Sequence, residues 1–505
     1  MTAITSRDRW WVRFSWLWLV LLTPLLVLSN GRWQLAIAAL ASPFFARLFL
    51  LSQPVVRGLL ILLPVQIVAY FFMWWEVIPA PGLLYYIIAA AYALCYFLPF
   101  VVDRIAANHI AGFASTLVLP LSWYLVDILI QFLTPYGSWS SAGYTQMGHG
   151  LLTPLAAWVG VAGVAFATVW VASIASWLVT SAAPARKRIH VLVFWAGAMA
   201  VLVLLARIPL PNGPTDTSTL TVAGITPSNE ATLRVTRAVQ EAREKGEFDD
   251  AVLLRLDQAV AELNDGLFMR SRHAALNGAD LVVWSETAAR TLGSEEVRLI
   301  ARGQEFARDA GVYLFLGLGV LHPGRQPPLE NKVIAITPSG EVAWHYRKAR
   351  PIVGSEAPFL PPGHDELPIL DTPFGRVGLV ICHDLDFADF VSQAGRMKVE
   401  LLLAPSADWA VIAELHARMG VMRAVENGFW LLRPVHDGLS VIASPAGQVT
   451  HSEYDAELED RVLMGKIQVM RIPTMYPQIR AYLPFVAITL LVGLLLLARQ
   501  KTPSR

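Results

Sequence analysis

The sequence predicts a chain of two parts, a multi-pass α-helical membrane domain followed by an α/β domain. The hydrophobic fraction is 55% and the charged fraction only 16%, whereas an average soluble domain carries roughly 25% charged residues. Long apolar runs follow one another as far as Leu205. Beyond them, short apolar runs alternate with charged, helix-favouring stretches, a pattern typical of a sheet covered by helices.

Seven apolar runs in the N-terminal part are interpreted as membrane-spanning helices. Each approaches or exceeds the ~20 residues that cross a bilayer when tilt is allowed. The first follows Arg7, Arg9 and Arg13 without a small-residue cleavage site after it, so we expect a retained anchor and not a signal peptide. The runs comprise residues 14–29, 34–52, 58–75, 82–101, 109–131, 151–179 and 190–206, and an eighth run comprises residues 481–498.

Basic residues are distributed unevenly between the predicted loops. The N-terminus and the loops that contain Arg57, Arg104 and residues 186–188 are basic, whereas loops 76–81 and 134–150 contain no Lys or Arg. The positive-inside rule then predicts a cytoplasmic N-terminus and a polar domain outside the cytoplasm. We therefore expect three regions, which are a seven-span domain (1–207), an extracytoplasmic domain (208–479), and a final span with a cytoplasmic tail (480–505).

Two charged residues lie within the predicted spans, Arg47 and Asp127. Intramembrane charges can mark a functional cavity, and these two could line a lateral one together with nearby Trp and Tyr residues. The simpler interpretation, which we favour, is that Arg47 extends its charged end to the membrane surface and the aromatic residues lie at the interfaces.

The polar domain is predicted to alternate strands and helices. A long helical stretch with a break near Gly246 separates the first two strands, and two strands flanking Pro338 to Gly340 form a hairpin. The predicted strands comprise residues 219–225, 279–283, 313–317, 331–337, 341–346, 376–381, 399–404, 429–434 and 440–443. The predicted helices comprise residues 230–275, 295–310 and 412–427.

Three polar residues with complementary chemistry each follow a predicted strand, namely Glu286, Lys348 and Cys382. The chain has only two cysteines, and the other, Cys95, lies in a predicted span. A buried cysteine is often an inert core residue, but a carboxylate can deprotonate a thiol and an ammonium group can stabilise an oxyanion. If the three strands are neighbours in one sheet, their ends meet, and these residues form a catalytic site.

The segments Trp284-Ser285-Glu286, Tyr346-Arg347-Lys348 and Ile381-Cys382 resemble the Glu-Lys-Cys triad of the nitrilase (carbon–nitrogen hydrolase) superfamily. The resemblance implies an α-β-β-α sandwich with Glu286 as general base, Lys348 as oxyanion stabiliser and Cys382 as nucleophile. Glu356 falls where a second essential glutamate is expected. The arrangement of spans around this domain resembles a membrane-bound branch that acylates lipoproteins in the bacterial inner membrane.

That branch implies a reaction in two halves. Cys382 would take an acyl chain from a phospholipid as a thioester, and the α-amino group of an N-terminal diacylglyceryl-cysteine would then receive it. The expected partners are therefore a phospholipid donor, a diacylglyceryl-lipoprotein acceptor and the membrane. No cofactor or metal is expected, because the histidines lack ligand spacing. The net charge of +1 provides no basis for nucleic-acid binding.

The nucleophile segment departs from the family pattern, and this leaves alternatives open. The usual Cys-Tyr-Glu is replaced by Cys382-His383-Asp384, in which Asp384 keeps the acid and His383 is either a packed ring or a proton shuttle. A divergent membrane-bound hydrolase or acyltransferase that acts on another amine or amide is therefore an alternative. An inactive scaffold or transporter is a third, disfavoured by the three retained residues.

Overall fold

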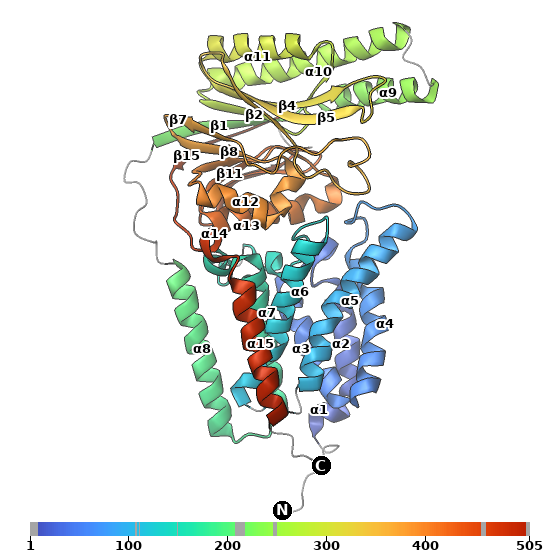
Figure 1. Ribbon diagram of the computed structural model, residues 1–505, viewed down its shortest axis with the longest axis vertical. Coiled ribbons are helices and arrows are strands. Elements are labelled where there is room, and N and C mark those ends of the chain that lie inside the picture. The colour runs from blue at the N-terminus through green and yellow to red at the C-terminus, as the bar shows by residue number, and fades with distance from the viewer. Residues whose placement is uncertain are drawn as a thin grey trace, which may run out of the picture. The chain divides into compact units, whose positions relative to one another are not determined.

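A computed structural model describes residues 9–106, 109–110, 112–148, 150–207, 218–245, 250–455 and 461–500. The chain folds into two compact units (Figure 1). Unit 1 comprises Met1–Pro209 with Met475–Arg505, and unit 2 comprises Leu210–Thr474.

Unit 1 is a bundle of apolar helices. Among the described residues, five helical segments are long and apolar enough to cross a membrane, residues 55–73, 83–106, 112–133, 153–180 and 185–207. The other three predicted spans form shorter apolar helices, residues 15–27, 36–52 and 483–497. The α-helices of this unit are α1 (Trp10–Arg13), α2 (Ser15–Val27), α3 (Ala36–Ser52), α4 (Val55–Met73), α5 (Leu83–Ala106), α6 (Val118–Leu133), α7 (Ala156–Thr180), α8 (Ala185–Arg207), α14 (Tyr476–Ile479) and α15 (Leu483–Gln500).

The interpretation of Arg47 as a side chain that extends to the membrane surface is wrong. Arg47 is only 2% exposed, and its Nε lies 2.8 Å from Oδ2 of Asp103 on α5. Its guanidinium also donates to Ser176 Oγ at 3.0 Å. Asp127 is likewise buried and accepts hydrogen bonds from Tyr96 and Ser141, both at 2.6 Å. A buried ion pair satisfies a charge that would be costly alone, so both residues belong to the interior of the bundle.

Unit 2 contains two sheets with helices on their outer faces, which confirms the predicted α-β-β-α sandwich. The first sheet has the order β15-β1-β2-β4-β5-β6, with β3 paired to β4. Its strands are β1 (Ser218–Ile225), β2 (Leu281–Trp284), β3 (Ala289–Leu292), β4 (Tyr313–Leu321), β5 (Leu329–Ile336), β6 (Val342–Arg347) and β15 (Val462–Val469). The predicted hairpin is the antiparallel pair β5–β6.

The second sheet has the order β14-β13-β11-β9-β8-β7. Its strands are β7 (Ile369–Thr372), β8 (Gly375–Leu379), β9 (Leu401–Leu403), β11 (Trp430–Arg433), β13 (Leu439–Ala443) and β14 (Val449–Tyr454). Two short strands, β10 (Ser406–Ala407) and β12 (Val435–His436), pair separately. The strands predicted from the sequence do not include β3, β7, β14 and β15, because each of these is short or carries exposed polar side chains.

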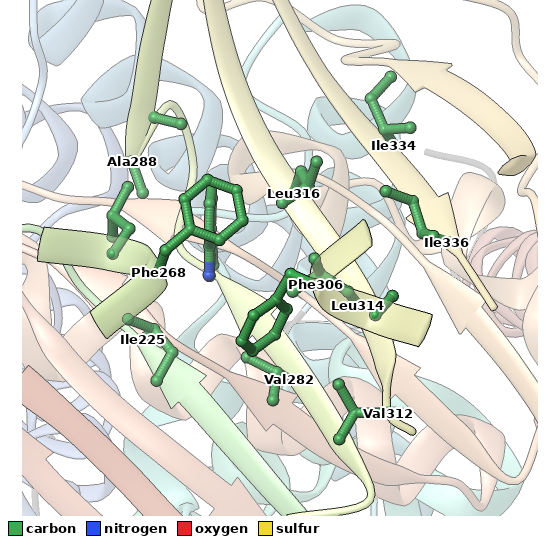
Figure 2. Close-up of a cluster of buried hydrophobic side chains, with 14 of the residues drawn as sticks. Ile225, Phe268, Val282, Ala288, Phe306, Val312, Leu314, Leu316, Ile334 and Ile336 are labelled. Atoms are coloured by element: carbon green, nitrogen blue, oxygen red, sulfur yellow. The ribbon is translucent and has the colours of Figure 1, made fainter. Parts of the chain in front are cut away.

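Helices cover the outer face of each sheet (Figure 1). The first sheet carries α10 (Asp250–Leu276) and α11 (Glu296–Ala310), and α9 (Asn229–Lys245) packs against α10. The second carries α12 (Ala388–Arg396) and α13 (Ala413–Asn427). Figure 2 shows the core beneath α10 and α11, where Phe268 and Phe306 lie against Val282 and Leu314 of the sheet. This apolar core holds β2 and β4 in fixed positions, and the loop after β2 carries Glu286.

Candidate active site

Glu286 lies in the loop that follows β2 and is 3% exposed. Its Oε1 accepts hydrogen bonds from Lys348 Nζ at 2.8 Å and from Asn331 Nδ2 at 2.6 Å. Its Oε2 accepts from the backbone N–H of Ala407 at 2.8 Å. A Cβ on Gly317 of β4 would lie 2.0 Å from the carbonyl oxygen of Ser285, so only glycine allows β4 to approach this loop so closely.

Lys348 follows β6 directly and is 1% exposed. Besides Glu286, its Nζ contacts the carboxylate of Glu356, whose oxygens lie 2.9 and 2.8 Å away. Burial lowers the pKa of Lys348, but the charges of Glu286, Cys382 and Glu356 outweigh that effect and hold the pKa well above its ordinary value. Lys348 is therefore a fixed cation between two carboxylates, and it stays protonated at neutral pH.

Cys382 begins a short 3₁₀ turn, Cys382–Asp386, a few residues after β8. Its φ is +48°, in the left-handed region that non-glycine residues rarely adopt and that often marks functional sites. The backbone N–H donates to Pro405 O at 3.0 Å, and Sγ lies 3.6 Å from Ala407 O. The strained turn therefore fixes the direction of the thiol.

The three residues come from two sheets, so the condition under which their strand ends would meet, neighbouring strands in one sheet, does not hold. Glu286 and Lys348 follow β2 and β6 of the first sheet, which β4 and β5 separate, and Cys382 follows β8 of the second. They still converge, because Lys348 contacts Glu286 directly and Ala407 contacts both Glu286 through its N–H and the Cys382 sulfur through its carbonyl oxygen. Burial first, and then the charge of Glu286, raise the pKa of Cys382 well above its ordinary value. The resting side chain is therefore a neutral thiol beside a carboxylate.

Asp384 connects the turn of Cys382 to the segment that carries Lys348. Its Oδ2 accepts from Tyr346 Oη at 2.8 Å and from Ile381 N at 2.9 Å, and its Oδ1 accepts from Arg350 N at 2.7 Å. Tyr346 and Arg350 flank Lys348 at two residues on either side. Asp384 therefore fixes the nucleophile turn relative to the lysine.

His383 is fully buried and packs its ring against Phe387, with ring centroids 5.1 Å apart. Its Nδ1 lies 2.6 Å from Oδ2 of Asp386. The ring is therefore held by packing against Phe387 and by its contact with Asp386.

Two further residues contribute to the site, Asn331 and Ala407, and the sequence analysis predicted a role for neither. Asn331 lies between Glu330 and Lys332 near the beginning of β5, and its side chain donates a hydrogen bond to Glu286. Its backbone carbonyl accepts a hydrogen bond from Lys348 N at 3.0 Å. Ala407 contributes only its backbone, whose N–H meets Glu286 while its carbonyl oxygen lies near the thiol. A backbone group leaves no side-chain pattern that a sequence could reveal.

A cavity of about 610 Å³ lies beside Glu286, Asn331 and Glu356. This volume falls within the ~300–1,000 Å³ of small-molecule sites. Helices α9 and α10 supply apolar walls, which include Val235, Val239, Leu256 and Val260. The cavity is therefore suited to a ligand that has a long apolar part and a reactive polar end.

Residues that can bind metals do come together in the fold, although their spacing in the sequence did not predict it. Ligand atoms of Cys382, Asp408 and His416 lie within 4.8 Å of one another. Asp408 already contacts Arg433 with both oxygens at 2.9 Å and His416 Nδ1 at 2.7 Å. A second group consists of His436, Asp437 and Asp455. The negative charge of Asp455 is balanced by Arg461, which lies 2.8 Å away. Ion pairs with arginine therefore account for carboxylates of both groups.

We expect His416 to make stability depend on pH. Burial lowers its pKa, but the Asp386 carboxylate 3.2 Å away outweighs that effect, and the pKa is about 9. Because the folded-state value exceeds the roughly 6.5 of an unfolded histidine, the stabilisation is complete below pH ~6.5 and is lost as pH rises through about 9.

Unfolding midpoints of the full-length protein and of His416→Gln, measured between pH 6 and pH 10 in detergent, check this. The difference between the two proteins should be largest at pH 6 and should shrink towards pH 10. A difference that stays constant with pH would show that His416 is not charged in the folded state.

Residues 236–475 match the family model described as carbon-nitrogen hydrolase. Unit 2, with its paired sheets and its Glu286–Lys348 contact beside Cys382, thus contains a carbon–nitrogen hydrolase domain. The relatives that align with most of the chain, including its apolar helices, are apolipoprotein N-acyltransferases. The chain is similar to these proteins over most of its length.

The similarity is distant but extends over both units. The apolipoprotein N-acyltransferase of Pseudomonas syringae is 26% identical over 441 residues, which are 83% of this chain and 81% of that protein. The one from Geobacter metallireducens is 24% identical and covers 70% of each chain. Among solved structures, an amidase from Nesterenkonia sp. is 21% identical, with a TM-score of 0.39, over 52% of this chain and 94% of the amidase.

Proposed function

We propose that this protein is a lipoprotein N-acyltransferase that carries the acyl chain as a thioester on Cys382. The observation that carries the proposal is the buried Glu286–Lys348 pair, in which Glu286 lines an apolar cavity and shares the contact residue Ala407 with the Cys382 thiol. The homology to apolipoprotein N-acyltransferases supports the same reaction class. The donor is a phospholipid, and the acceptor is the α-amino group of a diacylglyceryl-cysteine.

In the first half-reaction, Cys382 Sγ attacks the ester carbonyl while Glu286 takes the thiol proton. A base is needed at this moment because the pKa of Cys382 is raised and the thiol is neutral. Lys348, held as a cation, stabilises the oxyanion of the tetrahedral intermediate. Glu286 then returns the proton to the leaving alkoxide, so a lysophospholipid departs and the thioester remains.

In the second half-reaction, the α-amino group of the acceptor attacks the thioester carbonyl. Glu286 accepts the amine proton and passes it to the departing Cys382 sulfur, which leaves an amide and restores the thiol. Lys348 again stabilises the oxyanion. The single carboxylate therefore acts as base and acid in both halves.

The remaining predicted residues position these groups. Glu356 holds Lys348 between two carboxylates and accepts the backbone N–H of Ile352 at 2.8 Å. Asp384 joins the nucleophile turn to the lysine segment, and His383 packs that turn against Phe387. Each acts through another residue and not on the substrate.

The proposed location is the bacterial inner membrane, with the hydrolase domain on the extracytoplasmic side. Five long apolar helices support membrane insertion, and the basic loops around Arg57, Arg104 and residues 186–188 support a cytoplasmic N-terminus. Both proposed substrates are anchored in a bilayer, so a domain anchored there meets them without extracting them into water.

Mass analysis of the full-length protein after incubation with phospholipid vesicles tests the function. The peptide containing Cys382 should gain one acyl group, while the peptide containing Cys95 should stay unmodified. Addition of a diacylglyceryl-cysteine peptide should then remove the acyl group and yield an N-acylated peptide. An unmodified Cys382 would contradict the thioester, and release of free fatty acid alone would favour a hydrolase.

A further inference from the structure

A cation, Arg290, lines the cavity beside Glu286. The charged residues that line this cavity, among those the structure describes, are Glu286, Arg290, Glu330 and Glu356. Glu286 and Glu356 contact Lys348, and Glu330 contacts Lys332 and Arg325. Within the part of the chain that the structure describes, Arg290 has no carboxylate within ion-pair distance. A partly buried cation without a counter-ion is costly unless a ligand supplies one.

The backbone of Arg290 is fixed, while its guanidinium keeps most of its donors available. Asn264 of α10 donates to Arg290 O at 2.9 Å and accepts from Arg290 N at 3.3 Å. Nη1 donates to Thr236 Oγ1 of α9 at 3.2 Å. A guanidinium has five N–H donors, and this is its one hydrogen bond to described residues. Burial also lowers the pKa of Arg290, which reflects the same lack of a counter-charge.

The ligand chemistry follows from the arginine and from the walls around it. Planar guanidinium groups bind phosphate through two parallel hydrogen bonds, and the cavity is otherwise mostly apolar, with α9 and α10 supplying valine and leucine side chains. The Glu286–Lys348–Glu356 group has one cation for two carboxylates. Lys348 is thus already paired, so the lasting charge of a phosphate finds no spare cation there, and Arg290 is the lining residue that can balance it.

We propose that Arg290 binds the phosphate of the glycerophospholipid donor and thereby places its acyl ester at Cys382. The inference rests on the proposed function, because it assigns the donor of that reaction. The diacylglyceryl-cysteine acceptor carries no phosphate. Arg290 therefore acts in the first half-reaction and not in the second.

The test compares Arg290→Gln with wild-type full-length protein in detergent micelles, and Arg298→Gln on the exposed face of α11 is the control. With phospholipid, Arg290→Gln should need about 10-fold to 100-fold more donor for half-maximal thioester formation. With a nitrophenyl acyl ester, which has no phosphate, it should form the thioester as wild type does. Aminolysis of the preformed thioester should be unchanged.

Arg290→Lys keeps the charge without the planar pair of donors and should show an intermediate loss. Equal loss with both donors would indicate a structural role and overturn the inference. Slower aminolysis would overturn it too.

A binding measurement separates this inference from the catalytic proposal. Cys382→Ala cannot form a thioester but should bind dihexanoyl phosphatidylglycerol, and adding Arg290→Gln to it should weaken binding about 10-fold or more. Dihexanoylglycerol should bind both proteins equally. If binding depends on Arg290 while wild type forms no thioester, the phosphate site stands and the proposed function fails. If wild type and Arg290→Gln, both with Cys382 intact, form the thioester equally well at every phospholipid concentration, the phosphate site fails alone.

The binding test also includes displacement of the bound lipid by inorganic phosphate. It lacks the acyl chains that the apolar walls would hold, so it should displace the lipid only at much higher concentration. Displacement at the same concentration as the lipid would assign Arg290 to free phosphate and overturn the lipid assignment.

Discussion

Replacing Cys382 with alanine is expected to lower acyl transfer by at least about 10³-fold while leaving the fold intact. Transfer is lost because no other thiol lies in unit 2. Stability changes little, because the thiol makes one weak contact, 3.6 Å from Ala407 O. Alanine tolerates the +48° φ no worse than cysteine does. The measurement is N-acylation of a diacylglyceryl-cysteine peptide together with the unfolding midpoint of each protein.

Cys95→Ala is the matched control, since Cys95 and Cys382 are the only cysteines of the chain. Cys95 is half-buried on α5 of the helical unit, so its replacement should leave transfer within about twofold of wild type. Transfer that survives in Cys382→Ala would refute the nucleophile assignment, and transfer lost in Cys95→Ala would point to the other thiol.

The three candidate residues could be singled out in the sequence because each follows a local, recognisable pattern. Glu286 and Cys382 come after strongly apolar runs, and Lys348 ends the second strand of a hairpin with a clear turn. The proximity of these three residues could not be predicted from local sequence patterns, because it depends on how the two sheets pack against each other. The same limit hid β15, whose pairing with β1 joins residues that are far apart in the chain.

The polar surroundings of the site were harder to predict, for reasons that differ by residue. Arg47 and Asp103 pair across two helices, so neither residue alone reveals the contact. Arg433, Asp408 and His416 come from a strand, a loop and a helix. Each looks in sequence like an ordinary solvated charge or ring. Burial makes these contacts strong. Hydrophobic periodicity predicts which apolar residues are buried, but it does not predict which polar residues are.

Lys348→Met is expected to be both inactive and strongly destabilised. The side chains of Lys348 and Glu286 are 1% and 3% exposed, and loss of the cation leaves the buried Glu286 and the partly exposed Glu356 without this counter-charge. Removal of one partner of a buried ion pair costs about 3–5 kcal/mol. Activity falls as well, because the oxyanion loses its stabilising charge. Unfolding midpoints in detergent and initial rates of thioester formation measure the two effects.

Lys332→Met provides the comparison, since Lys332 also contacts two carboxylates, Glu296 and Glu330, each at 2.7 Å. It should cost less, because Glu330 keeps Arg325 at 3.0 Å and because the Lys332 side chain is 9% exposed, against 1% for Lys348. Adding Glu286→Gln to Lys348→Met should recover part of the stability, because it removes one of the uncompensated charges, but none of the activity. If the double variant is less stable than Lys348→Met alone, Glu286 is not the charge that Lys348 neutralises. The proposed electrostatic pairing of the general base with the oxyanion stabiliser would then be refuted.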